Sequence, residues 1–263
     1  MIAPVLEVQG LGKTFGNITA ARDITVAVPA RQTVGIIGAN GAGKTTFVNL
    51  ITGYLKPSCG RIRFEGNDIT DLSPREITRL GVGRSFQVAQ VFSTLSVLDN
   101  MAIAIGIARR GADAIWRPLR TRRLLDDAEA ILDRYRIAAY RHAVASTLPQ
   151  GVRKLLDIAM AVAAGPRLVL LDEPTSGISV EEKYEIMEVV IGALAATGLT
   201  VLFVEHDMEI VERYSERVLA FYDCTVIADG PPAEALHDQK VKRFVVGETL
   251  HRSARPAAAQ VRA

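Results

Sequence analysis

Residues 34–46 read VGIIGANGAGKTT, an apolar run that ends in glycines and continues through a lysine and two threonines into an expected helix. Four residues separate Gly38 from Gly43, and Lys44 and Thr45 follow directly. This is the spacing of a phosphate-binding P-loop between a buried strand and a helix. Glycines let successive backbone N–H groups converge on an anion, and the positive end of the following helix adds to the attraction. The stretch therefore predicts a phosphate site, the alternative being a glycine-rich turn without a ligand.

Two side chains of this loop have predicted chemical roles. The Lys44 ammonium can reach the outer phosphates as a point charge, and the Thr45 hydroxyl is placed to bind Mg²⁺, which prefers oxygen ligands. We expect the whole loop to contact the phosphates, with the contributing residues being Gly38, Asn40, Gly41, Ala42, Gly43, Lys44, Thr45 and Thr46.

Length and composition limit the class of protein. With 263 residues, of which 49% are hydrophobic, the chain can form one large domain or one domain with a smaller subdomain. A net charge of +2 is too balanced to indicate a nucleic-acid partner. Cys59 and Cys224 lie far apart, which favours reduced thiols in a cytosolic setting. The N-terminus does not resemble a signal peptide, and no apolar stretch reaches the roughly 18 residues of a transmembrane helix. Contact with a membrane is therefore expected to go through a partner.

The order of expected elements predicts an α/β fold with a mainly parallel sheet flanked by helices. Two early segments, 5–8 and 24–28, alternate apolar and polar residues as half-buried antiparallel strands do. Ser73 and Ser179 each precede a glutamate by three residues, which predicts capping boxes for two helices that end near Gly81 and Gly198. The remaining expected strands are 61–65, 82–86, 167–172 and 200–204, and further helices are expected over 97–108 and 124–135.

Polar residues follow three of these strands. Gln87 comes after strand 82–86, Asp172 and Glu173 end strand 167–172, and His206 follows strand 200–204. The carboxyl ends of parallel strands are where α/β sheets place ligands, so these side chains are candidates for one site.

Two other features leave alternatives open. Phe15, just upstream of the P-loop, can either stack on a nucleotide base or belong to the core. Six arginines lie between Arg109 and Arg123, around Trp116 and Pro118. They are either a solvated face of an inserted helical region or a surface for lipid headgroups or an acidic partner.

Together, the P-loop, Gln87, Asp172-Glu173 and His206 resemble the ATP-binding cassette of ABC transporters, over about residues 6–250. The resemblance implies a P-loop NTPase cassette, with a mainly parallel core, an antiparallel β subdomain and a helical subdomain at about 88–164. It implies a domain over 1–250, and we expect a disordered tail over 251–263 because that segment lacks apolar periodicity.

The resemblance also implies a role for each matching residue. Phe15 would stack on adenine, and Lys44 and the loop amides would hold the phosphates of ATP. Thr45, Gln87 and Asp172 would organise Mg²⁺, directly or through water. Glu173 would be the general base and His206 would contact the γ-phosphate, although a packed core histidine is the alternative for His206.

Three segments narrow the resemblance further, namely 81–87 (GVGRSFQ), 91–100 (VFSTLSVLDN) and 244–248 (FVVGE). They look like the ATP-binding subunits of branched-chain amino-acid importers, although urea-type importers share much of this pattern. The implied protein is an ATP-hydrolysing subunit at the cytoplasmic face of the inner (plasma) membrane. Its implied partners are membrane-spanning permeases, a second ATP-binding subunit or a second copy of itself, and indirectly a periplasmic or extracellular substrate-binding protein.

Two positions depart from the family pattern. Most cassettes have Leu-Ser-Gly-Gly-Gln where this chain reads LPQGV over 148–152, and most have aspartate where this chain has Ser179. The signature of one subunit closes over the nucleotide of the other, so Gly151 would contact the partner's ATP. Pro149 removes a hydroxyl from that contact, which is therefore weakened and not abolished, because Gly151 and the positive helix end remain.

Two other classes of function compete with transport. A soluble ABC ATPase of DNA repair would carry long coiled-coil or zinc insertions, and one of translation would carry two cassettes in one chain; the sequence has neither feature. A GTPase or small-molecule kinase could share the P-loop, but an Asn-Lys-x-Asp guanine motif is missing.

Overall fold

The structure is a computed structural model that describes residues 4–110 and 121–246. The expected tail over 251–263 and the arginines at 117 and 120 lie outside these ranges.

A six-stranded sheet forms the centre of the molecule, and its strand order is β10-β9-β3-β8-β7-β6. The five strands from β9 to β6 run parallel, and β10 joins β9 as an antiparallel edge. The expected α/β class with a mainly parallel sheet is therefore confirmed. The bounds are β3 Thr33–Gly38, β6 Val82–Ser85, β7 Leu168–Asp172, β8 Thr200–Val204, β9 Arg217–Tyr222 and β10 Thr225–Gly230.

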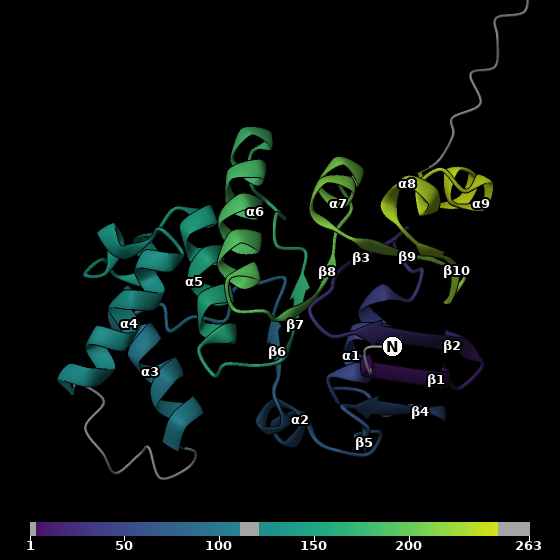
Figure 1. Cartoon of the computed structure of the whole chain (residues 1–263), viewed down its shortest axis with the longest axis horizontal. Coiled ribbons are helices and arrows are strands. Elements are labelled where there is room, and N and C mark those ends of the chain that lie inside the picture. Colours follow the sequence, from purple (N-terminus) through teal and green to yellow (C-terminus); the bar gives the residue numbers. More distant parts are fainter. Residues whose placement is uncertain (1–3, 111–120, 247–263) are drawn as a thin grey trace, which may run out of the picture.

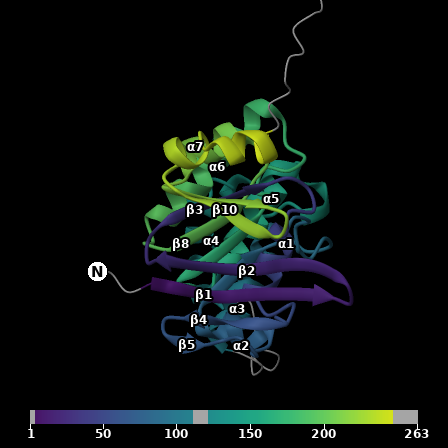
Figure 2. The same ribbon diagram turned by 90° about the vertical axis from the view of Figure 1, so that its right-hand side faces the viewer.

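A second sheet is antiparallel and has the order β2-β1-β4-β5. It lies below the central sheet in Figure 1 and is seen from its outer side in Figure 2. Its strands are β1 Pro4–Phe15, β2 Ile18–Pro29, β4 Cys59–Phe64 and β5 Asn67–Asp68. The first two strands are longer than the alternating segments predicted. Shifts of register between β1 and β2, near Gly10 with φ +55°, interrupt the alternation without ending the strands.

Helix α1, Lys44–Ile51, packs between the two sheets. Its buried residues Phe47, Val48, Leu50 and Ile51 share one hydrophobic core with inward-facing residues of β1, β2, β4 and the central strands. Alternate residues of the central strands point the other way, as the pleat requires. In β7, Leu168 and Leu170 belong to this core, whereas Val169 and Leu171 belong to a second one.

The second core lies under the larger helices. Helices α3, α4 and α5 gather at one end of the molecule in Figure 1, away from the antiparallel sheet, and α6 and α7 cover the central sheet. Their bounds are α3 Val97–Arg110, α4 Arg122–Arg134, α5 Gln150–Val162, α6 Val180–Ala195 and α7 Met208–Tyr214. Shorter helices are α2 Pro74–Leu80, α8 Pro232–Ala235 and α9 Gln239–Val241.

The two expected helix starts have different cap geometries. At α2, the Ser73 hydroxyl accepts from the Glu76 N–H while the Glu76 carboxylate accepts from the Ser73 N–H, so the predicted capping box is complete. At α6, the Ser179 hydroxyl accepts from the Glu182 N–H, but the Glu182 carboxylate accepts from that same hydroxyl at 3.0 Å. The second cap is therefore a serine cap whose glutamate bonds the side chain of Ser179.

Candidate functional site

A cleft of about 250 Å³ opens at the carboxyl ends of the central strands. The loop after β3 and the start of α1 line one side of it, and residues that follow β7 and β8 line the other. The predicted site residues among its lining are Asn40, Gly41, Ala42, Gly43, Lys44, Thr45, Thr46, Glu173 and His206. Ile18, Thr19, Ala20 and Cys224 complete it. Residues far apart in sequence thus meet at one site, as their places at the strand ends predict.

Backbone conformation explains the glycines of the P-loop. Gly38 has φ +152°, and a Cβ there would lie 2.5 Å from the carbonyl oxygen of Phe221, so a larger residue would collide with β9. Gly43 has φ +99° at the position that begins α1, and a Cβ would lie 3.0 Å from the Ala20 oxygen. Both positions require glycine, which lets the loop pass close to its neighbours and present α1's first turn to the cleft.

Lys44 is buried at the base of the cleft, with 6% of its surface exposed. Its ammonium donates to the carbonyl oxygen of Gly38 and, at 3.1 Å, to that of Ala39. Burial lowers the pKa of Lys44 from its ordinary value, while the charges of Glu173 and Asp172 raise it. A cation held at the start of a helix is well placed to attract an anionic ligand.

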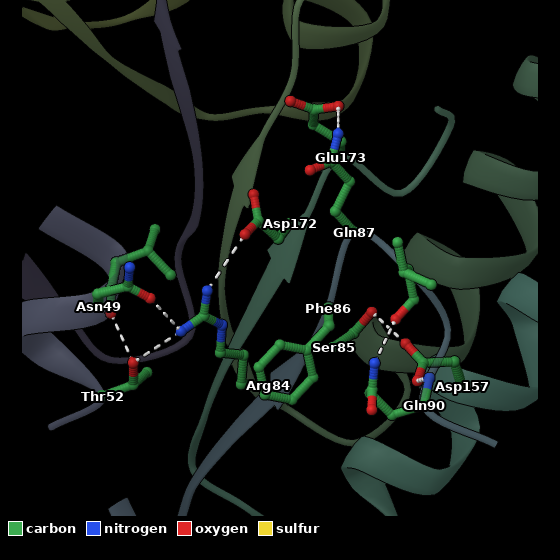
Figure 3. Close-up of polar contacts among 12 residues, drawn as sticks. Asn49, Thr52, Arg84, Ser85, Phe86, Gln87, Gln90, Asp157, Asp172 and Glu173 are labelled. Atoms are coloured by element: carbon green, nitrogen blue, oxygen red, sulfur yellow. Dashed lines mark hydrogen bonds and ion pairs between the residues drawn. The ribbon is translucent and has the colours of Figure 1, made fainter. Parts of the chain in front are cut away.

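Glu173 is contacted by two of the other predicted residues. The Gln87 amide Nε2 donates to one carboxylate oxygen at 2.9 Å, and His206 Nε2 lies 3.0 Å from the other. Figure 3 shows the side chain of Gln87, which follows strand β6, pointing toward Glu173. The side chain of His206 is 44% exposed, so the core-histidine interpretation is wrong. Glu173 also has φ +47°, a conformation that is uncommon outside glycine and is found at functional sites.

Asp172 has a different environment from its neighbour Glu173. It is buried, with 7% exposed, and its Oδ2 accepts from Arg84 Nη2 at 3.2 Å. The same guanidinium donates to the side chain of Asn49 in α1 at 2.7 Å and to that of Thr52, the C-cap residue of α1, at 3.1 Å (Figure 3). A carboxylate that is paired and fixed in this way is a preorganised oxygen ligand.

Five predicted residues are not part of the cleft lining: Gly38, Gln87 and Asp172, described above, and Phe15 and Gly151. Phe15 is 48% exposed at the end of β1, with the Lys13 ammonium 5.0 Å from its ring centre, so the core interpretation of Phe15 is wrong. Its proposed stacking on adenine stays a prediction. Gly151 belongs to a separate groove between α5 and α6, together with Pro149 and Ile186. Within one chain it therefore does not line the same cleft.

Two buried charged residues beside the site, Lys154 and Asp157, were missed by sequence reasoning. Lys154, on α5, donates to the backbone oxygens of Phe86, Gln87 and Asp172 at 2.7, 3.2 and 3.2 Å. Asp157, one turn later, accepts from the Ser85 hydroxyl at 2.8 Å and from the Gln90 N–H at 2.7 Å (Figure 3). Burial lowers the pKa of Lys154 and raises that of Asp157. The available signal was the spacing of Lys154 and Asp157, two opposite charges three residues apart in a helix whose later part is apolar.

Glu205 was also missed. It is 3% exposed, and one of its carboxylate oxygens accepts from the N–H and the hydroxyl of Thr175 at 2.9 and 2.7 Å. The other accepts from the His206 N–H at 3.2 Å. Glu205 thus joins Thr175, in the loop that begins with Glu173, to the backbone of His206. Burial raises the pKa of this carboxyl group.

The site's residues suit a nucleotide and Mg²⁺. Gly41 and Gly43 have positive φ in a loop that leads into α1, and Thr45 is exposed and lines the cleft. Among the described residues, no group of three or more His, Cys, Asp or Glu could form a metal site. Mg²⁺ at phosphates needs fewer, because it is held by one or two protein oxygens together with phosphate oxygens and water.

In the described part of the chain, none of the helices has both the length and the apolar character needed to cross a bilayer. The two cysteines, Cys59 and Cys224, are free, as their separation in the sequence predicts.

Comparisons with known proteins identify the family of this chain. The family model described as "ABC transporter" matches residues 21–176. A high-affinity branched-chain amino acid transport ATP-binding protein, BraF of Pseudomonas aeruginosa, is 30% identical over 254 residues, covering 94% of this chain and 100% of that protein. A probable branched-chain amino acid transport ATP-binding protein, LivG of Archaeoglobus fulgidus, is 31% identical over 249 residues, covering 92% of this chain and 95% of that protein.

Solved structures give the same result. The ADP conformation of an ATP-binding cassette of an ABC transporter superposes with a TM-score of 0.82 at 30% identity, covering 93% of this chain and 99% of the other. A nucleotide-free cassette gives 0.80 at 29% identity, covering 90% and 97%. The family match and the shared fold lead to the same conclusion as the P-loop and the strand-end residues. The chain belongs to the ABC transporter family, as one of its ATP-binding cassettes.

Proposed function

We propose that this chain is the ATP-hydrolysing, energy-coupling subunit of an importer for branched-chain amino acids. The observation that carries the proposal is that Glu173 and His206 line the P-loop cleft and that Gln87 contacts Glu173. The chain also aligns over nearly its whole length with branched-chain amino acid transport ATP-binding proteins. We propose that it works beneath membrane-spanning permeases at the cytoplasmic face of the plasma membrane, served by a secreted substrate-binding protein.

The proposed chemistry is mainly positioning and electrostatics, because phosphoryl transfer needs little covalent help from the protein. Lys44 and the N–H groups of the P-loop hold the phosphates of ATP in the proposed complex. Phe15 is proposed to stack on the adenine.

Glu173 is the proposed general base. Gln87 and His206 contact one carboxylate oxygen each, at 2.9 and 3.0 Å, so the group is held from two sides. A carboxylate with a fixed orientation can accept the proton of an attacking water more effectively than a freely rotating one. We propose that His206 then contacts the γ-phosphate.

Mg²⁺, when bound, would neutralise charge on the phosphates. Its proposed protein contacts are Thr45, Gln87 and Asp172, directly or through water. Thr45 lies in α1 and lines the cleft, Gln87 follows β6, and Asp172 ends β7.

We further propose that the working unit is a dimer of cassettes with unequal sites. Gly151 lies in the altered signature at the start of α5, and we propose that it faces ATP held by a second ATP-binding subunit. Pro149 precedes α5 without a side-chain cap bond to the helix. Gln150 Nε2 donates to the Ser176 oxygen at 3.4 Å and approaches Gly177, so this residue contacts its own chain's loop. A homodimer, in which both signatures are altered, is the alternative.

Coupling to a permease is tested at Phe92, which follows the Gln87 segment and is 49% exposed. We expect Phe92→Ala to lower transport by about tenfold, because truncating an exposed aromatic anchor at an interface typically removes more than 1 kcal/mol of binding. Basal ATP hydrolysis should stay near the wild-type rate. The measurement compares substrate uptake by cells with ATP turnover by the purified protein.

Phe244→Ala is the matched control, because Phe244 is 36% exposed and stacks on Tyr222 at the other end of the chain. It should leave both activities unchanged. Equal losses of transport and turnover in Phe92→Ala would mean that this loop has a structural role alone.

A further inference from the structure

Arg84 lies between three parts of the nucleotide site. It projects from β6, and its guanidinium spans the gap between α1 and the end of β7 (Figure 3). One terminal nitrogen, Nη1, donates to Asn49 and Thr52, and the other, Nη2, donates to Asp172. One side chain therefore joins the helix that follows the P-loop to the strand that carries the acidic pair.

The α1 partners of Arg84 are on the same face as Thr45. Residues four and seven positions apart in a helix lie one above the other, so Thr45, Asn49 and the C-cap residue Thr52 form one stripe along α1 and its C-terminal end. Arg84 donates to the two C-terminal residues of this stripe, Asn49 and Thr52, and Asp172 accepts from the other terminal nitrogen of the same guanidinium. The arginine thus sets the distance between the helix of Thr45 and the carboxylate of Asp172.

The guanidinium itself is tightly held. Its carbon lies 4.7 Å from the ring centre of Phe86 and 5.3 Å from that of Tyr54, and 9% of the side chain is exposed. Arg84 and its contacts fix one oxygen of Asp172, and Figure 3 shows the other oxygen directed away from the arginine.

A contribution to the stability of the fold does not by itself explain why residue 84 is an arginine. Its Nε is buried and has no hydrogen-bond partner among the described residues. A buried ion pair is often no more stabilising than well-packed apolar side chains of similar volume. A methionine would fill much of the same space beside Phe86 and Tyr54 without an unpaired donor.

We propose that Arg84 is a positioning residue for Mg²⁺ binding: it orients the Asp172 carboxylate relative to Thr45 through a single guanidinium. The inference rests on the proposed function, in which Thr45 and Asp172 contribute to the Mg²⁺ site. Partners that orient metal-binding side chains typically matter by ten- to hundredfold in metal affinity.

The test is a titration of MgCl₂ into the purified full-length chain with a fluorescent ATP analogue, compared with binding of the analogue in EDTA. Arg84→Met should raise the Mg²⁺ concentration for half-maximal enhancement by about ten- to hundredfold and leave the affinity in EDTA within about twofold of wild type. Arg84→Lys should restore part of the effect, because lysine keeps the charge but lacks the planar fork that holds both sides.

Arg217→Met is the matched control. Arg217 also forms a two-point ion pair, with Asp229 at 2.5 and 2.7 Å, but it lies outside the cleft. This variant should leave the Mg²⁺ requirement unchanged. A second test variant, Asn49→Leu, removes one contact on the α1 side while Asp172 keeps its arginine. It should raise the Mg²⁺ requirement by a smaller factor, and it tests the inference even if Arg84→Met does not fold.

Two results would overturn the inference. An unchanged Mg²⁺ requirement in folded Arg84→Met and Asn49→Leu would make Arg84 a structural residue, and a lowered requirement would show that the arginine's charge competes with the metal. Failure of the proposed function looks different, because the wild-type chain itself would then show no enhancement of ATP binding by Mg²⁺.

Discussion

Glu173→Gln is expected to lower ATP turnover and transport by a hundredfold or more, on the order of what the loss of a positioned catalytic group costs. Glutamine keeps the size of the side chain and one carbonyl oxygen, but it does not accept the proton from water. Nucleotide affinity should remain close to that of wild type, since Lys44 and the P-loop are unchanged. The measurement is ATP turnover of the purified complex together with ATP binding by the isolated chain.

The same turnover measurement, made on a Gly151 variant as well as on Glu173→Gln, decides whether the two nucleotide sites of the dimer are unequal or equal. A Cβ at Gly151 would lie 2.6 Å from Ile186 Cδ1, so Gly151→Ala should be made together with Ile186→Val, which removes that methyl group. With a second subunit that has an intact signature, this double variant should cost much less than Glu173→Gln. A small loss of ATP turnover in Glu173→Gln together with a large loss in the Gly151 variant would place the working site on the other subunit. Large losses in both variants would indicate a homodimer.

Lys44→Ala is expected to weaken ATP binding by about ten- to hundredfold or more, because hydrogen bonds to charged groups contribute roughly 1.5–3 kcal/mol. The fold should persist, because the Lys44 ammonium donates to backbone oxygens of its own loop, those of Gly38 and Ala39. Calorimetric titration with ATP measures the affinity, and thermal unfolding checks the fold.

Lys56→Ala is the control for this change. Lys56 also donates to a backbone oxygen, that of Leu72, but it lies outside the cleft. It should bind ATP as the wild type does. An unchanged ATP affinity in Lys44→Ala would contradict the assignment of residues 38–45 as the phosphate site.

The sequence was most informative where a pattern depends on local geometry. The spacing of Gly38, Gly43 and Lys44 predicts a strand, a loop and a helix, because only glycine tolerates those backbone angles and close approaches. The apolar run before Asp172 likewise predicts a strand buried on both faces. Both predictions are confirmed, and the sheet order then brings Glu173 and His206 to the cleft.

The parts that sequence reasoning missed depend on contacts between distant segments. Arg84 contacts Asn49, 35 positions away, and Asp172, 88 positions away, and no local pattern records either pairing. Glu205 precedes His206 at a strand end, and its Thr175 partner is 30 positions away. The exposure of Phe15 likewise follows from where β1 ends, which the interrupted alternation near Gly10 concealed.

Uptake of labelled substrates by cells that lack this chain tests the central claim most directly. Cells are supplied with low concentrations of leucine, isoleucine or valine and, separately, of urea. The proposal predicts that uptake of the branched-chain amino acids falls without the chain, returns with the wild-type chain and does not return with Glu173→Gln, while urea uptake is unaffected. Unchanged leucine uptake in cells without the chain, its restoration by Glu173→Gln, or a selective loss of urea uptake would contradict it.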